Sequence, residues 1–366
     1  MSNIIPVYKP FITGNEKKYI NECIDSSWIS SKGSFINKFE NEFSRYINIK
    51  HSSSVCNGTV AIHLGIEALG ITSGDEVIVP TFTYIASVNA IAYSGAEPVF
   101  VDSQIDSWNL DPEKIEKKIT NKTKAILVVH LYGASCEMDK ILDLCKKYNL
   151  FLIEDTAEAF GSKYNNKYLG TFGDISTFSF FGNKTITTGE GGMVCTNNKL
   201  LNDKVNKLKN QGVSLEKEYW HNILGYNYRM TNICAAIGLA QLETADLIIK
   251  KKYEISEHYK RELNESGLIF QSQPENSVHS QWMFSVLAKN KKLRNNIRKE
   301  LKNNGVETRP FFYPAHLMPV FKSSSNYKVA ESISERGFNL PSYPALTEKQ
   351  IIFICDIVKK ALKCKS

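Results

Sequence analysis

The 366-residue sequence has no apolar run long enough to cross a lipid bilayer. Its longest apolar stretches, such as residues 125–131, are far shorter than the ~20 residues of a membrane-spanning helix. The opening residues Met1-Ser2-Asn3 do not show the charged and then apolar pattern of a signal peptide. We therefore expect a soluble, cytoplasmic protein with no membrane partner.

Cysteine pairs with the spacing of a metal or redox site are also absent. None of the eight cysteines forms a Cys-x-x-Cys pair, and no cysteines and histidines have the spacing of metal ligands. The sequence therefore predicts no metal site, and in the cytoplasm such cysteines are expected to be reduced, buried and inert. They are Cys23, Cys56, Cys136, Cys145, Cys195, Cys234, Cys355 and Cys364.

Glycine and proline are few, at 21 and 11 residues, and the sequence has no internal repeat or low-complexity tract. With 42% hydrophobic and 23% charged residues, the composition is that of a globular protein and excludes fibrous and disordered classes. The net charge of +7 comes from scattered lysines, not from a basic stripe interleaved with aromatic residues. We therefore expect no nucleic-acid partner.

What the sequence does contain is a regular alternation of helical and strand patterns. Short apolar strands that do not alternate with polar residues are typical of a parallel sheet with helices on both faces. We therefore predict an α/β fold with a mostly parallel central sheet. The helical patterns cover residues 59–69, 85–93, 112–119 and 138–148, and the strands that follow them cover 76–79, 98–101, 125–129 and 151–154.

The pattern changes in the second half of the chain. Strands predicted at 175–181 and 192–196 are separated by a Gly- and Thr-rich turn instead of a helix, which indicates a hairpin that carries a functional group. We predict a large domain over residues 1–247, with an N-terminal helical segment, and a smaller C-terminal α+β domain over residues 248–366. Further helices are predicted at 233–242, 248–263, 293–303 and 348–362, with a strand near 282–287.

Two residues with distinctive chemistry follow predicted strands. Asp155 ends one strand, and Lys184 lies in a Gly-flanked loop after another. Ligands of open parallel sheets bind beyond the carboxyl ends of the strands. A lysine and a carboxylate there suit pyridoxal 5'-phosphate (PLP), because the lysine bonds to the cofactor's aldehyde and the carboxylate keeps the pyridine nitrogen protonated. On these residues alone, Asp155 could equally cap a helix and Lys184 could be an exposed loop charge.

A third feature is the run Asn57-Gly58-Thr59, which directly precedes the first predicted helix. Backbone N–H groups at a helix N-terminus bind phosphate, and the hydroxyl of Thr59 could add a further hydrogen bond. The same run could also be a plain capping turn.

Longer motifs resemble the DegT/DnrJ/EryC1 family of PLP-dependent sugar aminotransferases, and the resemblance covers essentially the whole chain. The most specific motif is GDISTFSFFGNKTITTGEGG at 173–192. It is accompanied by PTFTY at 80–84, EDTAEAFGS at 154–162 and GYNYRMTN at 225–232. The resemblance implies the fold-type-I, aspartate aminotransferase-like architecture, with PLP as cofactor and pyridoxamine phosphate (PMP) as its intermediate form.

The resemblance also implies a role for each residue of the cofactor site. Lys184 would be the covalent anchor and the base that moves the substrate proton, and Asp155 would pair with the pyridinium nitrogen. Tyr84 would stack on one ring face and Ala157 would pack against the other, although Tyr84 could instead be a core aromatic residue. The implied cofactor-binding set is Gly58, Thr59, Tyr84, Asp155, Ala157, Glu158, Ser179, Lys184 and Asn227, with Gly58, Thr59 and Ser179 on the phosphate.

For the substrates, the resemblance implies a homodimer with shared active sites. Asn227 would reach across the interface to the cofactor phosphate, and Arg229 would hold the carboxylate of L-glutamate with its bidentate guanidinium. Alternatively, Arg229 forms a surface ion pair that caps the following helix. The implied sugar-nucleotide contacts are Trp28, Ser30, Ser31, Tyr313 and His316, of which His316 could equally be a packed structural histidine.

Two more motifs and one single residue narrow the range of expected substrates. WISSKG at 28–33, RPFFYPAH at 309–316 and Glu158, where many family members have Gln or His, resemble the branch that forms GDP-perosamine. The implied reaction transfers an amino group from L-glutamate to GDP-4-keto-6-deoxymannose, for surface polysaccharide such as O-antigen or capsule. A UDP- or dTDP-linked keto sugar or a small phosphorylated ketone remains an alternative acceptor. A dehydratase, which has His in place of Lys184, and a non-catalytic regulator with the same fold are further alternatives.

Overall fold

The computed structural model describes residues 4–214 and 216–363. Met1 to Asn3 and Cys364, on which two expectations rest, lie outside these residues. The helices are α1 (Glu16–Asp25), α2 (Ser34–Ile47), α3 (Gly58–Leu69), α4 (Ala86–Tyr93), α5 (Met138–Tyr148), α6 (Lys199–Lys209), α7 (Asn232–Glu243), α8 (Ala245–Leu263), α9 (Lys291–Asn303), α10 (Lys328–Arg336) and α11 (Glu348–Lys363). The strands are β1 (His51–Val55), β2 (Glu76–Pro80), β3 (Glu97–Val101), β4 (Thr123–Val129), β5 (Phe151–Asp155), β6 (Lys163–Tyr164), β7 (Lys167–Tyr168), β8 (Ile175–Ser179), β9 (Gly192–Thr196), β10 (Ile269–Phe270), β11 (Ser277–Val278), β12 (Phe284–Leu287), β13 (Arg309–Pro310) and β14 (Gly337–Leu340).

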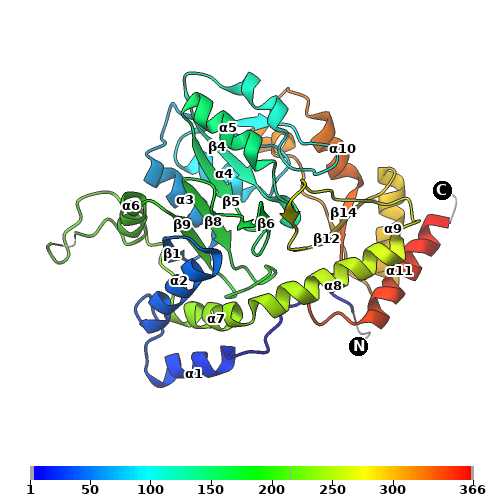
Figure 1. The fold of residues 1–366 in the computed structure, drawn as a ribbon, viewed down its shortest axis with the longest axis horizontal. Helices are drawn as coiled ribbons and strands as arrows, with labels where there is room; N and C mark the ends of the chain where they lie inside the picture. Colours follow the sequence, from blue (N-terminus) through cyan, green and yellow to red (C-terminus); the bar gives the residue numbers. More distant parts are fainter. Residues whose placement is uncertain (1–3, 215, 364–366) are drawn as a thin grey trace.

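A seven-stranded sheet forms the centre of the molecule, with the order β1-β9-β8-β5-β4-β2-β3 (Figure 1). The pairings from β8 through β5, β4 and β2 to β3 are parallel. Strand β9 is antiparallel to both of its neighbours, β1 and β8, because β8 and β9 are joined by a short connection without a crossover helix. The predicted α/β fold with a mostly parallel sheet is confirmed. Strands β2, β5 and β8 therefore end at one edge, where ligands bind in such sheets.

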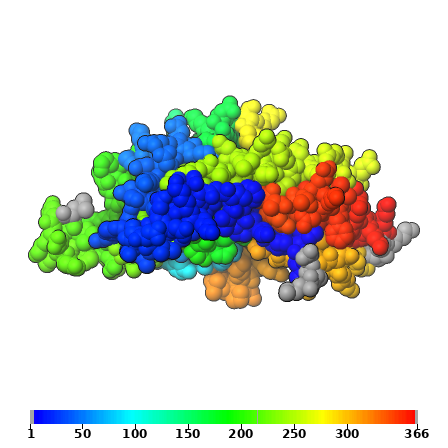
Figure 2. Space-filling view, turned by 90° about the horizontal axis from the view of Figure 1, so that it is seen from below, coloured from blue at the N-terminus to red at the C-terminus, as the bar shows by residue number. Residues whose placement is uncertain are grey.

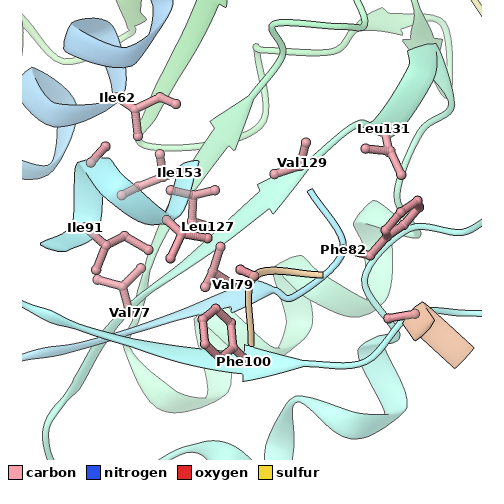
Figure 3. Packing of buried hydrophobic residues seen from close by; sticks show 14 of the residues in the cluster. Ile62, Val77, Val79, Phe82, Ile91, Phe100, Leu127, Val129, Leu131 and Ile153 are labelled. Atoms are coloured by element: carbon pink, nitrogen blue, oxygen red, sulfur yellow. The ribbon is translucent and has the colours of Figure 1, made fainter. Parts of the chain in front are cut away.

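The strands of this sheet are apolar on both faces, as their continuous apolar sequences predicted. On one face Val77, Val79 and Leu127 pack against Ile62 of α3 and Ile91 of α4 (Figure 3). These residues come from four different elements and are almost fully buried.

The opposite face of the sheet is covered by α5. There Ile78, Ile126 and Val128 pack with Met138 and Ile141 of that helix. Residues next to each other in one strand thus point to opposite cores, which is the consequence of the two-residue strand period. Helices α3 and α4 on one side and α5 on the other give the three-layer arrangement that was predicted.

A second, antiparallel sheet lies in the C-terminal part, with the order β10-β12-β14-β13. A separate apolar cluster joins it to α8, α9 and α11. Helix α8 runs without interruption through position 247, where a domain boundary was predicted, so that boundary stays a prediction. Phe311, Tyr327 and Ile333 pack into the core of the large sheet, so the C-terminal part is not self-contained.

The prediction of an α-helix at residues 112–119 is wrong. The structure has two three-residue 3-10 turns there, at Pro112–Lys114 and Glu116–Lys118. Asp111 accepts a hydrogen bond from the N–H of Glu113 and starts the first turn, but Ile119 is already extended. The segment does bury Ile115 and packs Ile119 against the same core, but it does so from two 3-10 turns, and eight residues are too few to form an α-helix on helical propensity alone.

Helices α7 and α8 run along the lower side of the molecule, and the chain between α6 and α7 projects away from the body (Figure 1). Seen from below, the N-terminal segment lies beside the C-terminal residues (Figure 2). Among residues 4–214 and 216–363, no single helix is long and apolar enough to span a membrane. Helices α7 and α8 pass that test only when taken together, and they are bent by 62° relative to each other.

The described cysteines are all free. Five of them are buried, and Cys56 and Cys234 are partly exposed.

Candidate active site

Lys184 lies in the connection between β8 and β9, beyond the carboxyl end of β8. Its backbone N–H donates to the carbonyl of Phe181 at 2.9 Å, which closes a turn, and its own carbonyl accepts from the hydroxyl of Tyr8. Its Nζ lies 4.1 Å above the centre of the Trp282 ring and 4.0 Å from Oε1 of Glu158. Burial lowers the pKa of Lys184, and the charges of Glu158 and Asp155 act in the opposite direction.

Glu158 follows the end of β5 and is also buried. Its Oε2 accepts a hydrogen bond from the backbone N–H of Tyr132 at 2.8 Å. Burial raises the pKa of Glu158 to about 7, against the opposing effect of the nearby Lys184 charge. This carboxyl group can therefore take up or release a proton near neutral pH.

Asp155 is the last residue of β5, at the same sheet edge. Its Oδ2 accepts from the hydroxyl of Ser87 at 2.7 Å, and its Oδ1 accepts from the N–H of Ala157 at 3.1 Å. Burial raises the pKa of Asp155, and these two hydrogen bonds and the charge of Lys184 act in the opposite direction. The side chain is thus held in one orientation next to Lys184 by partners on α4 and on its own loop.

The N-terminus of α3 forms a third side of the site. Asn57 caps the helix, since its Oδ1 accepts from the N–H of Val60 at 3.0 Å. Gly58 lies against Ser179, the last residue of β8: a Cβ atom on Gly58 would approach the Cβ of Ser179 to 2.7 Å. This close approach brings the first-turn N–H groups of α3 and the hydroxyl of Ser179 to one place, as an anion-binding site requires. Thr59 follows in the same turn.

Tyr84 is not part of the core, because 57% of it is exposed. It follows β2 at the same sheet edge and packs against Phe312, with 5.6 Å between the ring centres. The alternative interpretation of Tyr84 as a core aromatic residue is therefore wrong. Ala157 is half-buried in the loop after β5.

Asn227 and Arg229 lie in an extended segment between α6 and α7. Nη2 of Arg229 donates to Oδ1 of Asn227 at 2.9 Å. On the other face of the segment, Tyr226 and Tyr228 stack on each other and contact His63 of α3, with 5.0 Å between the ring centres of His63 and Tyr226. The alternation of side chains thus directs Asn227 and Arg229 away from the core.

The alternative role of Arg229 does not match this geometry. Within the described part of the chain it forms no ion pair, and α7 is capped by the hydroxyl of Thr231, which accepts from the N–H of Cys234 at 3.3 Å. The cap of α7 is therefore formed by Thr231 and does not involve Arg229.

The five expected sugar-nucleotide residues fall into two places. Trp28, Ser30 and Ser31 lie in the loop between α1 and α2, and the backbone of this loop contacts Asn232 at the start of α7. Trp28 and Tyr313 are 55% and 64% exposed, respectively, so their rings are free to meet a ligand.

His316 has different surroundings from the other four. It is 1% exposed, its Nδ1 lies 2.7 Å from Oγ1 of Thr81, and its Nε2 lies 3.3 Å from Oε1 of Glu331. These are the contacts of a packed structural histidine, the alternative that the sequence left open, because both ring nitrogens already have protein partners.

Several residues of the site were missed from the sequence. Trp282 is buried beneath the Lys184 amine and donates from Nε1 to the carbonyl of Asn183 at 2.7 Å. Tyr8 fixes the carbonyl of Lys184 from the N-terminal segment, and the charge of Arg309 adds to the lowering of the Lys184 pKa. Trp282 lies in a predicted apolar strand, and Arg309 was noted only as part of the RPFFYPAH motif, so neither was connected with Lys184 until the fold brought them to it.

The DegT/DnrJ/EryC1/StrS aminotransferase family matches residues 10–359, nearly the whole chain. The chain belongs to this family. A family member from Escherichia coli O157:H7 named GDP-perosamine synthase is 56% identical over 357 residues, which cover 97% of this chain and 98% of that protein. A member from Vibrio cholerae with the same name is 50% identical over 368 residues, covering 99% of this chain and all of that protein.

Solved structures of DegT-family aminotransferases have the same fold. The aminotransferase TlmJ from Streptoalloteichus hindustanus superposes with a TM-score of 0.94 at 28% identity and covers 98% of this chain and 99% of its own. Spr1654 from Streptococcus pneumoniae, solved in PLP and PMP forms, has a TM-score of 0.93 at 27% identity; the PMP form covers 98% of both chains. This chain is accordingly a PLP-dependent sugar aminotransferase of fold type I.

The residues at the sheet edge fit this cofactor chemically. A buried lysine with a lowered pKa, a buried carboxylate at the next strand end and a helix N-terminus packed against a serine hydroxyl are the three groups that PLP requires. The contact between Gly58 and Ser179 leaves no room for a side chain between them, which keeps the phosphate side of the site open to backbone N–H groups.

Proposed function

We propose that this enzyme transfers the amino group of L-glutamate to GDP-4-keto-6-deoxymannose and so forms GDP-perosamine for surface polysaccharide. The observation that carries the aminotransferase chemistry is the buried Lys184 amine, 4.0 Å from Glu158 and next to Asp155. The choice of acceptor rests on relatives with the name GDP-perosamine synthase, which are 56%, 50% and 46% identical over nearly the whole chain.

In this proposal the sheet edge holds PLP. Lys184 is its covalent anchor, Asp155 pairs with the ring nitrogen, and Gly58, Thr59 and Ser179 hold the phosphate. Tyr84 and Ala157 flank the ring, and Glu158 lies beside the anchor amine. When bound, PLP would supply an aldehyde that carries the amino group from the donor to the keto sugar, and an electron-withdrawing ring that stabilises the electron pair left when the donor's proton is removed.

The protein's own residues then move a single proton. With PLP bound, the free Lys184 amine would take up the proton that the donor's α-carbon loses and pass it on, and it would move a proton in the reverse direction for the acceptor. Burial lowers the pKa of Lys184, which makes the neutral amine that this role needs easier to form. Glu158, with a pKa near 7, can stabilise the ammonium form while the proton is held. Trp282 covers the amine on one side and excludes water.

Substrate binding is proposed to require two subunits. Arg229 and Asn227 would act on the partner's site, Arg229 on the donor carboxylate and Asn227 on the cofactor phosphate. Two features support this proposal. Their side chains point away from their own core, and the nearby projecting chain exposes Tyr219 at 93% and Leu224 at 87%, which is costly for an isolated subunit.

For the acceptor, the proposal assigns the stacking face of Trp28, the hydroxyls of Ser30 and Ser31, and the ring of Tyr313. All four are accessible or partly accessible in the structure. We propose the cytoplasm as the compartment of the reaction, which suits the free cysteines.

The test is an absorbance spectrum of the purified protein with PLP, recorded before and after L-glutamate, and then after GDP-4-keto-6-deoxymannose. We expect a visible band of the lysine-bound cofactor that glutamate bleaches and the keto sugar restores. Lys184→Ala should lack the band of the bound cofactor. A band restored by a dTDP- or UDP-linked keto sugar but not by the GDP sugar would overturn the acceptor and keep the chemistry. No band with wild-type protein would overturn both.

A further inference from the structure

Asn232, the buried first residue of α7, holds the loop between α1 and α2. Its Nδ2 donates to the carbonyl of Trp28 at 2.7 Å and to Sγ of Cys23 at 3.3 Å. Its Oδ1 accepts from the N–H of Phe35 at 3.0 Å, and its own N–H donates to the carbonyl of Ser30 at 2.6 Å. One residue thus contacts the end of α1, the loop and the start of α2.

The loop has few other means of support. Residues 28–33 have no regular secondary structure, and Trp28 and Ser30 are exposed. Among the described residues, only Asn232 forms hydrogen bonds between residues 28–33 and a distant part of the sequence. The position of this loop therefore depends on Asn232 more than on burial of its own side chains.

Gly33 shows how tightly the loop is fitted to this amide. Its φ of +148° is one that residues with a side chain rarely adopt, and a Cβ atom there would lie 2.3 Å from Cγ of Asn232. A side chain at position 33 would force Asn232 to move, so the loop keeps this fit to Asn232 only with glycine at position 33.

The amide nitrogen of Asn232 donates to two protein partners and its amide oxygen accepts from a third, so the side chain is committed to contacts within the protein. Asn232 is also three residues from Arg229 in the chain. We propose that Asn232 is a positioning residue that fixes the Trp28–Ser31 loop for the sugar nucleotide, relative to the segment that carries Asn227 and Arg229. This inference rests on the proposed function, because it takes the loop as the acceptor's binding site.

A cavity of ≈ 540 Å³ lies at this junction and has the size of a nucleotide-binding pocket. Its wall contains Trp28, Gly33, Asn232 and the carboxylate of Glu22. If the loop moves, the Trp28 side of the cavity moves with it, while Lys184 and the cofactor residues stay in place. Loss of Asn232 should therefore weaken acceptor binding and spare the reaction with glutamate.

The test uses the full-length holoenzyme with Asn232→Asp and, separately, Gly33→Ala. Asn232→Asp has nearly the same shape and keeps the acceptor for the Phe35 N–H, but it places an oxygen against the Trp28 carbonyl. Gly33→Ala disturbs the same contact from the loop side and leaves Asn232 intact. The matched control is Asn296→Asp, because Nδ2 of Asn296 also donates to a carbonyl between two helices, that of Ala361 at 3.3 Å, far along the chain in α9 and α11.

Two kinds of measurement are made on each variant, one of binding and one of loop exposure. The first is the dissociation constant for GDP, used as the probe, together with KM for L-glutamate in the bleaching of the cofactor band. We expect about tenfold weaker GDP binding in Asn232→Asp and Gly33→Ala, as for one lost buried hydrogen bond, and an unchanged KM for glutamate. Asn296→Asp should change neither value.

The second measurement is the quenching of Trp28 fluorescence by acrylamide without ligand, obtained as the difference between each protein and its Trp28→Phe counterpart. Faster quenching of Trp28 in Asn232→Asp supports the inference whatever the acceptor is. Unchanged quenching together with unchanged GDP binding overturns it. If wild-type protein reacts with glutamate but does not bind GDP, the proposed GDP-linked acceptor is wrong, and unchanged quenching in that case overturns the positioning role as well.

Discussion

The amine of Lys184 and the carboxylate of Glu158 lie 4.0 Å apart in a buried site. Burial lowers the pKa of Lys184 and raises the pKa of Glu158, and both shifts favour the neutral forms. Each charge stabilises the other when both are present, because opposite charges at this distance attract strongly where water is excluded. Neither group is therefore independent of the other. The carboxylate controls how readily Lys184 holds a proton.

The first prediction concerns this coupling. In Glu158→Gln the Lys184 ammonium loses the attraction of the carboxylate, so its pKa should fall further below the ordinary value. PLP bonds only to the neutral amine, and the rate of band formation by cofactor-free protein should therefore reach its midpoint at lower pH than in wild type. Stopped-flow absorbance over a pH series measures that midpoint. An unchanged midpoint would show that the two groups are not coupled in solution.

The same pair predicts how the stability of the cofactor-free protein depends on pH. The pKa of Glu158 is raised from 4.5 to about 7 in the folded state, so the folded protein binds the proton more tightly than the unfolded chain. This contribution to stability is present below pH 4.5 and is lost as the pH rises through about 7. Its full size is of order a few kcal/mol. The melting temperature at pH 5 minus that at pH 8 should be lower in Glu158→Gln than in wild type, because the variant lacks the Glu158 contribution and its further lowered Lys184 pKa acts in the same direction. An equal value in both proteins would contradict the raised pKa.

A third prediction concerns Asp155. Asp155→Asn is nearly the same size and can still accept from Ser87, so we expect a folded protein that binds PLP. It lacks the negative charge that holds the ring nitrogen protonated, and kcat should fall on the order of 10²-fold or more. Ser87→Ala is the matched control. It removes one hydrogen bond of 2.7 Å to the carboxylate but keeps the charge, and it should cost about tenfold or less. Similar kcat values for wild type and Asp155→Asn would refute the assigned role.

A fourth prediction separates two roles of the contact between Gly58 and Ser179: the packing of α3 against β8, and the binding of the PLP phosphate. Gly58→Ala places a Cβ atom 2.7 Å from the Cβ of Ser179, so the variant should be less stable and bind PLP more weakly. Adding Ser179→Gly removes the clash and should restore the melting temperature. It should not restore PLP affinity, because the serine hydroxyl is lost as well. Full recovery of affinity in the double variant would mean that Ser179 does not contact the phosphate.

The elements with a clear apolar period were predictable from the sequence. Residues 138–148 form the helix α5 where it was expected, since the apolar residues recur on one face and Asn149 ends the helix in the left-handed conformation. Helix α2 carries an equally plain signal in Phe35, Phe39, Phe43 and Ile47, one turn apart, which supports the helical segment expected near the N-terminus. Asp155 and Lys184 were found because they follow strands of a parallel sheet.

Features that depend on distant partners were not predictable. Strand β1 has the polar sequence HSSSV, and its serines are satisfied only by contacts such as those of Ser54 with Glu40 at 2.7 and 2.8 Å. Trp282 and Lys184 are nearly one hundred residues apart, and neither sequence context indicates the other. The motif around His316 suggested a ligand contact, but the fold buries that ring between Thr81 and Glu331. The local sequence does not determine whether a histidine such as His316 binds a ligand or packs inside the protein, because both roles suit its chemistry.

The last prediction tests whether active sites are shared between subunits. If Lys184 belongs to one subunit and Arg229 of the other binds the donor, Lys184→Ala and Arg229→Ala will each be inactive or weak alone. Mixed dimers then contain one site with both defects and one site with neither, so mixing the two variants should restore up to about a quarter of wild-type activity, because half of the dimers are mixed and half of their sites are intact.

The mixing experiment is done by unfolding and refolding the two variants together, with each variant refolded alone as the control. Arg229→Ala alone should raise KM for glutamate by about 10- to 100-fold, the effect of one lost charge-assisted pair. Light scattering gives the oligomeric state of each sample. If the mixture is no more active than the sum of its parts while dimers form, Arg229 serves the site of its own subunit, and the segment from Tyr226 to Arg229 must then turn inward from the position that His63 now gives it.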